Sequence, residues 1–322
     1  MRVALVLGSG GARGYAHIGV LDALRERGFD VVGISGSSMG ALVGALQAAD
    51  KLDEFTSWAS ALTQSAVLRL LDPSLTAAGV LRAEKILADV REIIGPRTIE
   101  SLPIPYTAVS TDLIAGKSVW LQRGPIDAAI RASIAIPGVI APYLLDGRLL
   151  ADGGILDPLP MAPLAAVNAD LTIAVSLNAS DPNPTPDSPR PTAELLNRMR
   201  RSTTSLIDRA AASTLLDGPT ARSVLSRFSN AVDGIDAATE SEVETEEDTH
   251  VPRLGGFEVM NRTIEISQAA LMRHTLAAYP PDLLIEVPRT VCRSLEFYRA
   301  SEVIEIGHEL ACAALDSLDL AD

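Results

Sequence analysis

The sequence predicts an α/β fold in which a mainly parallel sheet lies between two layers of helices. Near the start of the chain, short aliphatic runs at residues 3–7 and 30–34 alternate with helical patterns. Such alternation is typical of parallel sheets that are covered by helices on both faces. The 322 residues are 47% hydrophobic but only 4% aromatic. We therefore expect one or two domains with a mainly aliphatic core.

The first half of the chain begins as strand, glycine loop, helix, strand, sharp turn and helix. Residues 3–7 have the short, wholly apolar pattern of a buried strand. The helical pattern from Tyr15 to Arg27 stops before Gly28, a residue suited to a left-handed helix end. Patterns farther along predict strands at 30–34, 103–110, 118–121, 149–151 and 171–177, and helices at 41–46, 53–94 (with a break near 72–74) and 126–134.

Composition changes after residue 178. Residues 181–191 contain five prolines, which predicts an extended linker. A basic amphipathic helix is expected at 192–216, and the acidic run 233–249 has too little apolar content to pack. We therefore divide the chain into a core (1–178), an insertion with the linker, basic helix and mobile acidic loop (179–256), and a C-terminal part (257–322) that completes the core with helices at 257–278 and 301–318 and a strand at 283–287.

Charge and cysteine content narrow the class of protein. The net charge of −14 argues against a nucleic-acid partner. Cys292 and Cys312 lack metal-type spacing and fit a reduced, cytoplasmic protein. We expect no cofactor. We see no leader segment, and the apolar stretch 129–145 is interrupted by an arginine and two prolines. Any membrane contact should therefore be peripheral.

The candidate nucleophile is Ser38, in the pentapeptide Gly36-Ser37-Ser38-Met39-Gly40. This G-x-S-x-G pattern lies between a predicted strand and a predicted helix, the context of a nucleophile elbow. The flanking glycines would let the strand and helix approach closely, and the helix N-terminus would offer amide groups to a developing anion. An ordinary glycine- and serine-rich turn is the competing interpretation of the pentapeptide alone.

A second glycine-rich loop, Gly8 to Gly14, follows the first strand. It is not a dinucleotide fingerprint, because Arg13 stands where the third glycine of G-x-G-x-x-G is required. Next to the elbow, the small residues Gly10, Gly11 and Ala12 could offer backbone amides to an oxyanion, together with Met39. Arg13 either anchors this loop by a salt bridge or neutralises a nearby anion.

The serine also needs a base, and the four histidines lack a triad context. Asp152 is the better candidate because it ends a predicted strand and is followed by Gly153-Gly154. These glycines leave room for a substrate or another backbone segment. The competing interpretation is an aspartate that bonds only to its own turn.

Together these motifs resemble the patatin-like phospholipases, in particular the shorter bacterial members. Gly10-Gly11-Ala12-Arg13-Gly14 is similar to the family's oxyanion loop, Gly36–Gly40 to its nucleophile elbow, and Asp152-Gly153-Gly154 to its D-G-G/A element. The stretch Arg131-Ala132-Ser133-Ile134-Ala135-Ile136-Pro137-Gly138 is similar to a further signature of the family. The resemblance covers roughly residues 2–177 in the same order.

The resemblance implies a patatin-like three-layer fold and a Ser38–Asp152 dyad without histidine or metal. It implies hydrolysis of lipid acyl esters, of the phospholipase A or lysophospholipase type, through an acyl-enzyme. Asp157, in Asp157-Pro158-Leu159-Pro160, replaces an asparagine common in the family and adds a carboxylate near the site. A catalytically silent lipid-binding adaptor, and an acyltransferase or thioesterase with the same dyad, remain alternatives. Headgroup, acyl position, chain length and oligomeric state do not follow from the sequence.

Overall fold

The computed structural model describes residues 1–70, 84–179 and 256–318. The chain divides into two units, one formed by residues 1–182 with 254–322 and the other by residues 183–253. All described residues belong to the first unit. The predicted linker, basic helix and acidic loop lie outside the described residues, as does the predicted break near 72–74.

The centre of the sheet consists of parallel strands. These strands are β1 (Arg2–Leu7), β2 (Asp30–Ser37), β3 (Tyr106–Asp112), β7 (Leu171–Ala179) and β8 (Leu283–Pro288). They lie in the order β3–β2–β1–β7–β8, and each pairs in parallel with its neighbours. Every residue of β3 is buried, as expected for a strand covered on both faces. Because parallel strands end at one edge, the loops after β1 and β2 meet there.

An antiparallel extension completes this eight-stranded sheet beyond β3. Its strands are β4 (Lys117–Leu121), β5 (Tyr143–Leu145) and β6 (Arg148–Asp152). Both β4 and β6 pair with β3, and β5 pairs with β6. The direction of β6 carries the end of that strand, Asp152, back toward the centre of the sheet.

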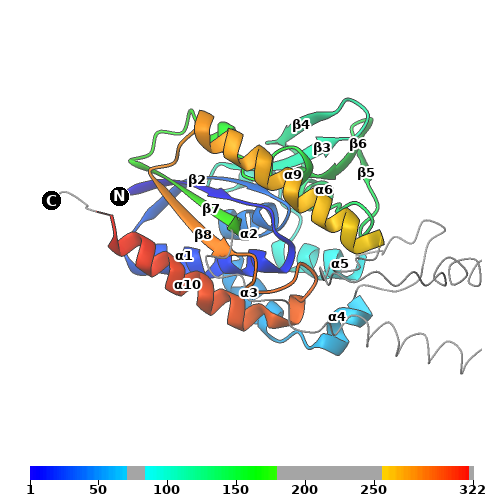
Figure 1. The fold of residues 1–322 in the computed structure, drawn as a ribbon, viewed down its shortest axis with the longest axis horizontal. Coiled ribbons are helices and arrows are strands. Elements are labelled where there is room, and N and C mark those ends of the chain that lie inside the picture. The colour runs from blue at the N-terminus through cyan, green and yellow to red at the C-terminus, as the bar shows by residue number, and fades with distance from the viewer. Residues whose placement is uncertain (71–83, 180–255, 319–322) are drawn as a thin grey trace, which may run out of the picture. The chain divides into compact units, whose positions relative to one another are not determined.

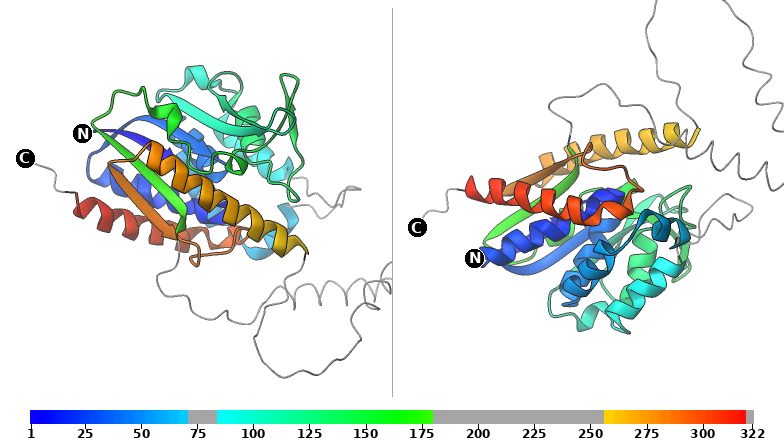
Figure 2. Two further views of the ribbon diagram at one scale, coloured as in Figure 1. Left: turned by 45° about the horizontal axis from the view of Figure 1, so that its top comes forward. Right: turned by 90° about the horizontal axis from the view of Figure 1, so that it is seen from below.

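Helices cover both faces of the sheet (Figures 1 and 2). The α-helices are α1 (Ala16–Glu26), α2 (Met39–Ala48), α3 (Leu52–Ser60), α4 (Gln64–Leu70), α5 (Glu84–Ile94), α6 (Ile126–Ser133), α9 (Gly256–Ala278) and α10 (Ala300–Asp316). Short 3₁₀ turns are η1 (Gly11–Tyr15), η2 (Ile99–Ser101), η3 (Gly153–Ile155), η4 (Ala162–Leu164) and η5 (Phe297–Arg299). Figure 2 shows α9 on one face of the sheet and α1 and α10 on the other.

The order of the strands explains this division. The chain moves in one direction from β1 through β2 to β3, but in the opposite direction from β7 to β8. Right-handed crossovers therefore place α1 and α2 on one face and α9 on the other. The larger core cluster joins the sheet to the α1 and α10 side, and a smaller one centred on Leu159, Met161 and Met272 joins it to α9.

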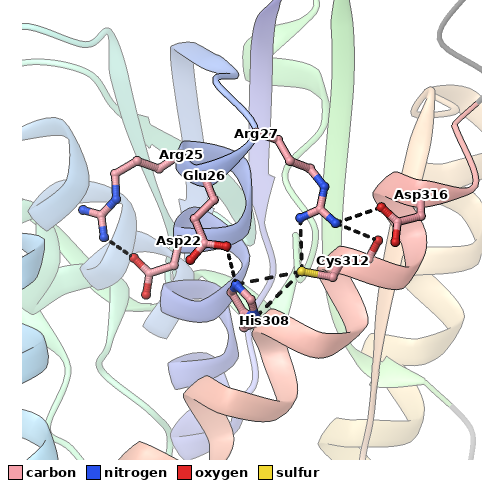
Figure 3. A network of polar contacts seen from close by, with 7 residues as sticks. All are labelled: Asp22, Arg25, Glu26, Arg27, His308, Cys312 and Asp316. Atoms are coloured by element: carbon pink, nitrogen blue, oxygen red, sulfur yellow. Dashed lines mark hydrogen bonds and ion pairs between the residues drawn. The ribbon is translucent and has the colours of Figure 1, made fainter.

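The helices α1 and α10 pack with their backbones in contact. A Cβ on Gly19 would collide with the Ile304 carbonyl, and one on Gly307 with the Ala16 carbonyl. Beyond this crossing, polar side chains link the same two helices (Figure 3). Arg27 donates to Asp316 Oδ1 at 2.8 Å and to Cys312 Sγ at 3.1 Å. Cys312 is a free thiol, as is buried Cys292.

Most of the predicted elements are confirmed with small shifts of their ends. The long helical stretch 53–94 is divided, since α3 ends at Ser60 and α4 begins at Gln64. Sequence reasoning missed β5, a three-residue strand that exists through its pairing with β6. So short a strand has no periodicity of its own.

Candidate active site

Ser38 stands at the junction of β2 and α2, as the N-terminal cap of the helix. Its φ of 57° lies in the left-handed region, where the backbone of a residue other than glycine is strained. The flanking glycines are sterically required: a Cβ on Gly36 would collide with the Gly40 carbonyl, and one on Gly40 with the Leu7 carbonyl. The strand and helix therefore approach each other as closely as a nucleophile elbow requires.

Ser133 supports the strained elbow through hydrogen bonds. The Ser38 amide donates to Ser133 Oγ at 3.0 Å, and this hydroxyl donates to the Val109 carbonyl at 2.6 Å. Ser133 is fully buried at the end of α6. The sequence placed Ser133 in a family signature but gave it no role, because its partners are separated from it by 95 and 24 residues.

Asp152 lies in direct contact with Ser38. The Ser38 hydroxyl donates to Asp152 Oδ2 at 2.5 Å, and the Gly154 amide donates to Asp152 Oδ1 at 2.8 Å. Asp152 is 5% exposed. Burial raises the pKa of its carboxyl to about 6, although the hydrogen bonds from Ser38 and Gly154 act in the opposite direction. The aspartate therefore bonds both to its own turn and to the serine.

Strand pairing positions this carboxylate. Asp152 is opposite Ser110 in the antiparallel pairing of β6 with β3. Its backbone amide donates to the Ala135 carbonyl at 3.0 Å, and Thr111 Oγ1 donates to its carbonyl at 3.0 Å. A Cβ on Gly153 would collide with the Val109 carbonyl, so the turn after Asp152 packs directly on β3.

The glycine loop passes beside the elbow and begins the turn η1. Gly11 has a φ of +57°, and a Cβ there would collide with the Ser294 carbonyl. A Cβ on Gly14 would collide with the Met39 side chain, which explains the need for a glycine where the two motifs touch. The structure thus brings the loop, the elbow and Asp152 together.

The backbone amides of the loop differ in whether they already donate a hydrogen bond within the protein. The Ala12 amide donates to the Ser294 carbonyl at 2.9 Å. This bond corrects the expectation that Ala12 offers its amide to an oxyanion, because the donor is already used. Within the described ranges, no acceptor takes up the amides of Gly10, Gly11 or Met39. Ser294 was missed because it is 282 residues away in sequence.

Arg13 projects from this loop into the protein and is 4% exposed. Its Nη2 lies 3.4 Å from Glu265 Oε1 on α9 and 3.5 Å from Asn178 Oδ1 at the end of β7. Of the two roles left open by the sequence, the structure shows the anchoring salt bridge.

None of the described histidines contacts the dyad. His17 is fully buried with its Nε2 2.8 Å from the Gly8 carbonyl, and burial lowers its pKa to about 4. His308 Nε2 lies 2.8 Å from Glu26 Oε2 between α1 and α10 (Figure 3). His274 is exposed on α9, and His250 lies outside the described residues. Among the described side chains, Asp152 is therefore the candidate base.

An apolar pocket opens onto Ser38. Its wall includes Phe55 and Trp58 of α3 and Ile86 of α5. The remaining lining residues are Gly11, Tyr15, Met39, Leu42, Leu62, Val67, Ile134, Ile136, Val139, Ile140, Leu295 and Phe297. Aromatic side chains pack against one another in this wall, with the ring centroids of Phe55 and Trp58 5.5 Å apart. The pocket suits a hydrocarbon chain.

Asp157 adds a second partly buried carboxyl near the elbow. Its carbonyl accepts a hydrogen bond from Ser37 Oγ at 2.6 Å, and its amide donates to the Gly153 carbonyl at 2.9 Å. Burial raises the pKa of its side chain to about 6. The backbone of Asp157 therefore joins the elbow to the Asp152 turn.

The described residues contain neither a cluster of metal-binding side chains nor a candidate membrane-spanning helix. Within residues 1–70, 84–179 and 256–318, no three side chains of the metal-binding types lie close enough to hold an ion. In the same ranges, no helix has the length and apolar character needed to span a bilayer.

Comparisons with known proteins place the chain among its relatives. A family model for patatin-like phospholipases matches residues 5–165, which contain both Ser38 and Asp152. An uncharacterized NTE family protein of Mycobacterium tuberculosis is 66% identical over 335 aligned residues, with 100% of this chain and 93% of the relative covered. The patatin-like phospholipase domain-containing protein 6 of Homo sapiens is 33% identical over 186 residues, which are 56% of this chain and 14% of that protein.

A structural neighbour is VipD from Legionella pneumophila, with a TM-score of 0.44 and 16% identity over 98% of this chain and 66% of VipD. The family model and the long, highly identical relative decide the assignment. The chain belongs to the patatin-like phospholipase family, and this membership implies lipid acyl hydrolase activity.

Proposed function

We propose that the protein is a serine acyl hydrolase that cleaves lipid acyl esters through a Ser38–Asp152 dyad. One observation carries this proposal: Ser38 Oγ lies 2.5 Å from a buried Asp152 carboxylate, and Ser38 also lines an apolar pocket. Nucleophile, base and acyl-chain site thus converge on one residue. No cofactor takes part in the proposed reaction.

In the first half-reaction, Ser38 Oγ attacks the ester carbonyl while its proton passes to Asp152 Oδ2. A carboxylate with a pKa of about 6 is ionised at neutral pH and is a stronger base than an exposed aspartate. The developing oxyanion would accept hydrogen bonds from the unused amides of Gly10, Gly11 and Met39. The N-terminus of α2 adds favourable electrostatics at the same place.

Collapse of the tetrahedral intermediate breaks the ester bond. Asp152 returns the proton to the leaving alcohol, and the acyl group remains on Ser38. A water molecule then gives a proton to Asp152 and attacks the acyl carbon. The bond from that carbon to Ser38 Oγ breaks, the fatty acid leaves, and Asp152 returns the proton to Ser38 Oγ. The same groups serve both half-reactions, because each proceeds through an oxyanion in the same position.

The pocket supports a lipid acyl ester as the substrate class. Apart from Ser38, its lining consists of Tyr15, aliphatic and aromatic side chains, and Gly11. Burial of each methylene group of an acyl chain contributes about 0.8 kcal/mol. Phospholipids and lysophospholipids have such chains on an ester carbonyl. With the chain bound in the pocket, the carbonyl carbon would lie at Ser38.

The test uses nitrophenyl esters of increasing chain length and mixed phospholipid and lysophospholipid vesicles. Wild-type protein should hydrolyse both, with kcat/KM rising as the acyl chain lengthens. Ser38→Ala and Asp152→Asn should lose activity while remaining folded. A wild type that binds vesicles but cleaves no ester would instead indicate a lipid-binding adaptor. Faster turnover of acyl thioesters, or acyl transfer to added alcohols, would replace the hydrolase proposal with a thioesterase or transferase.

A further inference from the structure

Helix α9 lies outside the residues matched by the family model, yet it contacts two parts of the candidate site. Glu265 reaches Arg13 in the glycine loop at 3.4 Å. Three residues later, Gln268 approaches the turn after Asp152, since a Cβ on Gly154 would lie 2.8 Å from Gln268 Nε2. Residues three apart lie on one face of a helix. One face of α9 therefore touches both the proposed oxyanion loop and the turn of the proposed base.

We propose that Glu265 is a positioning residue that holds the glycine loop in its oxyanion-binding geometry through Arg13. This inference rests on the proposed function, because it concerns the amides of Gly10 and Gly11. Glu265 itself touches no substrate in this account. It fixes Arg13, and Arg13 fixes the backbone of the loop.

The environment of Arg13 makes Glu265 important. The side chain of Arg13 is 5% exposed and that of Glu265 is 14% exposed, so water screens the pair only weakly. Asn178, the other described partner, is neutral and 3.5 Å away. Arg13 Nε has no hydrogen-bond partner among the described residues. Without Glu265, the buried guanidinium would lose its counter-ion.

A displaced guanidinium would move the end of the loop that Arg13 belongs to, although other contacts hold the residues before it. The Ala12 amide is held by the Ser294 carbonyl, and Gly10 packs against the Leu177 side chain. Arg13 follows Ala12 directly, so a shift of Arg13 toward solvent would rotate the peptide units before it. A displacement of about 1 Å in a reacting group can lower a rate by about 100-fold.

The loss should appear in kcat and not in KM. Oxyanion donors bind the transition state more strongly than the ground state, whereas the apolar pocket binds the acyl chain in both. We therefore expect Glu265→Gln to lower kcat on a nitrophenyl ester by about 10- to 100-fold, with KM changed less than about twofold. Glu265→Asp keeps the charge and should recover part of the rate.

The matched control is Glu309→Gln, the same change at an exposed site on α10, which should leave kcat unchanged. In an Arg13→Met background, Glu265→Gln should have little further effect, because it acts through Arg13. Unchanged or increased kcat in Glu265→Gln would overturn the proposal. The proposal would also be overturned if Glu265→Asp had as low a kcat as Glu265→Gln. It would be overturned, too, if Glu265→Gln lowered kcat as strongly in the Arg13→Met background as in wild type.

Hydrogen exchange separates this inference from the proposed function. A peptide covering residues 8–15 should exchange faster in Glu265→Gln than in wild type, while peptides from α10 should not change. This measurement requires no activity, so it tests the link even if wild type hydrolyses no ester. Unchanged exchange in residues 8–15 would overturn the inference and leave the dyad proposal standing.

Discussion

Asp152→Asn separates the contribution of Asp152 to stability from its role as the proposed base. Asparagine has nearly the size of aspartate and retains an oxygen to accept the bond from the Gly154 amide. It carries no negative charge and cannot take the Ser38 proton. The substitution should therefore lower kcat/KM by about 10²- to 10⁴-fold, the range typical for loss of a general base.

The same substitution should stabilise the protein at neutral pH. Burial raises the pKa of Asp152 from 3.8 to about 6, so the folded state binds this proton more tightly than the unfolded state. The free energy of unfolding therefore falls as pH rises from about 4 to about 6, and remains lower above that range. This shift corresponds to about 3 kcal/mol, an upper limit for the gain in Asp152→Asn at pH 7.5.

The assay is urea unfolding of wild type and Asp152→Asn at pH 7.5 and pH 4.5. The stability difference should be about 1–3 kcal/mol at the higher pH and much smaller at the lower. Asp146→Asn, at an exposed turn between β5 and β6, is the control and should show no such pH-dependent gain. Equal or lower stability of Asp152→Asn at pH 7.5 would refute the claim that the buried charge is unfavourable.

Three further predictions concern the pH profile, the elbow and the helix crossing. As the pH increases, kcat/KM on a nitrophenyl ester should rise with an apparent pKa of about 6, because Asp152 ionises. Full activity at pH 4.5 would contradict the role of Asp152 as the base. Ser133→Ala leaves the Ser38 amide and the Val109 carbonyl without their partner. It should reduce the free energy of unfolding by about 1–3 kcal/mol and also lower kcat. Unaltered urea unfolding and kinetics would show that Ser133 does not support the elbow. Gly19→Ala forces a Cβ against the Ile304 carbonyl and should cost about 1–3 kcal/mol in urea unfolding; a wild-type midpoint would show that α1 and α10 can separate.

The local motifs were readable from the sequence because each has its own steric requirement. The elbow at Ser38 requires glycines at 36 and 40, and the glycine spacing excluded a dinucleotide loop at Arg13. The central strands were readable from their aliphatic runs, because a strand buried on both faces must be apolar throughout. The choice of Asp152 came from its glycine-rich context and from the family resemblance.

Contacts between distant residues were not readable. The Ser294 carbonyl takes the Ala12 amide, and Glu265 reaches Arg13 across 252 residues of sequence. Neither partner belongs to a motif, because a carbonyl is present in every residue and a glutamate on a helix is usually solvated. The outcome for Ala12 depended on how the segment after β8 crosses the loop, which no local pattern encodes.

The most direct test of the dyad is mass spectrometry of the protein quenched during turnover of a long-chain nitrophenyl ester. We expect one acyl group on the peptide that contains Ser38 in wild type. We expect no adduct in Ser38→Ala and strongly slowed acylation in Asp152→Asn. An acyl group on another residue, or acylation of Asp152→Asn at the wild-type rate, would contradict the Ser38–Asp152 mechanism.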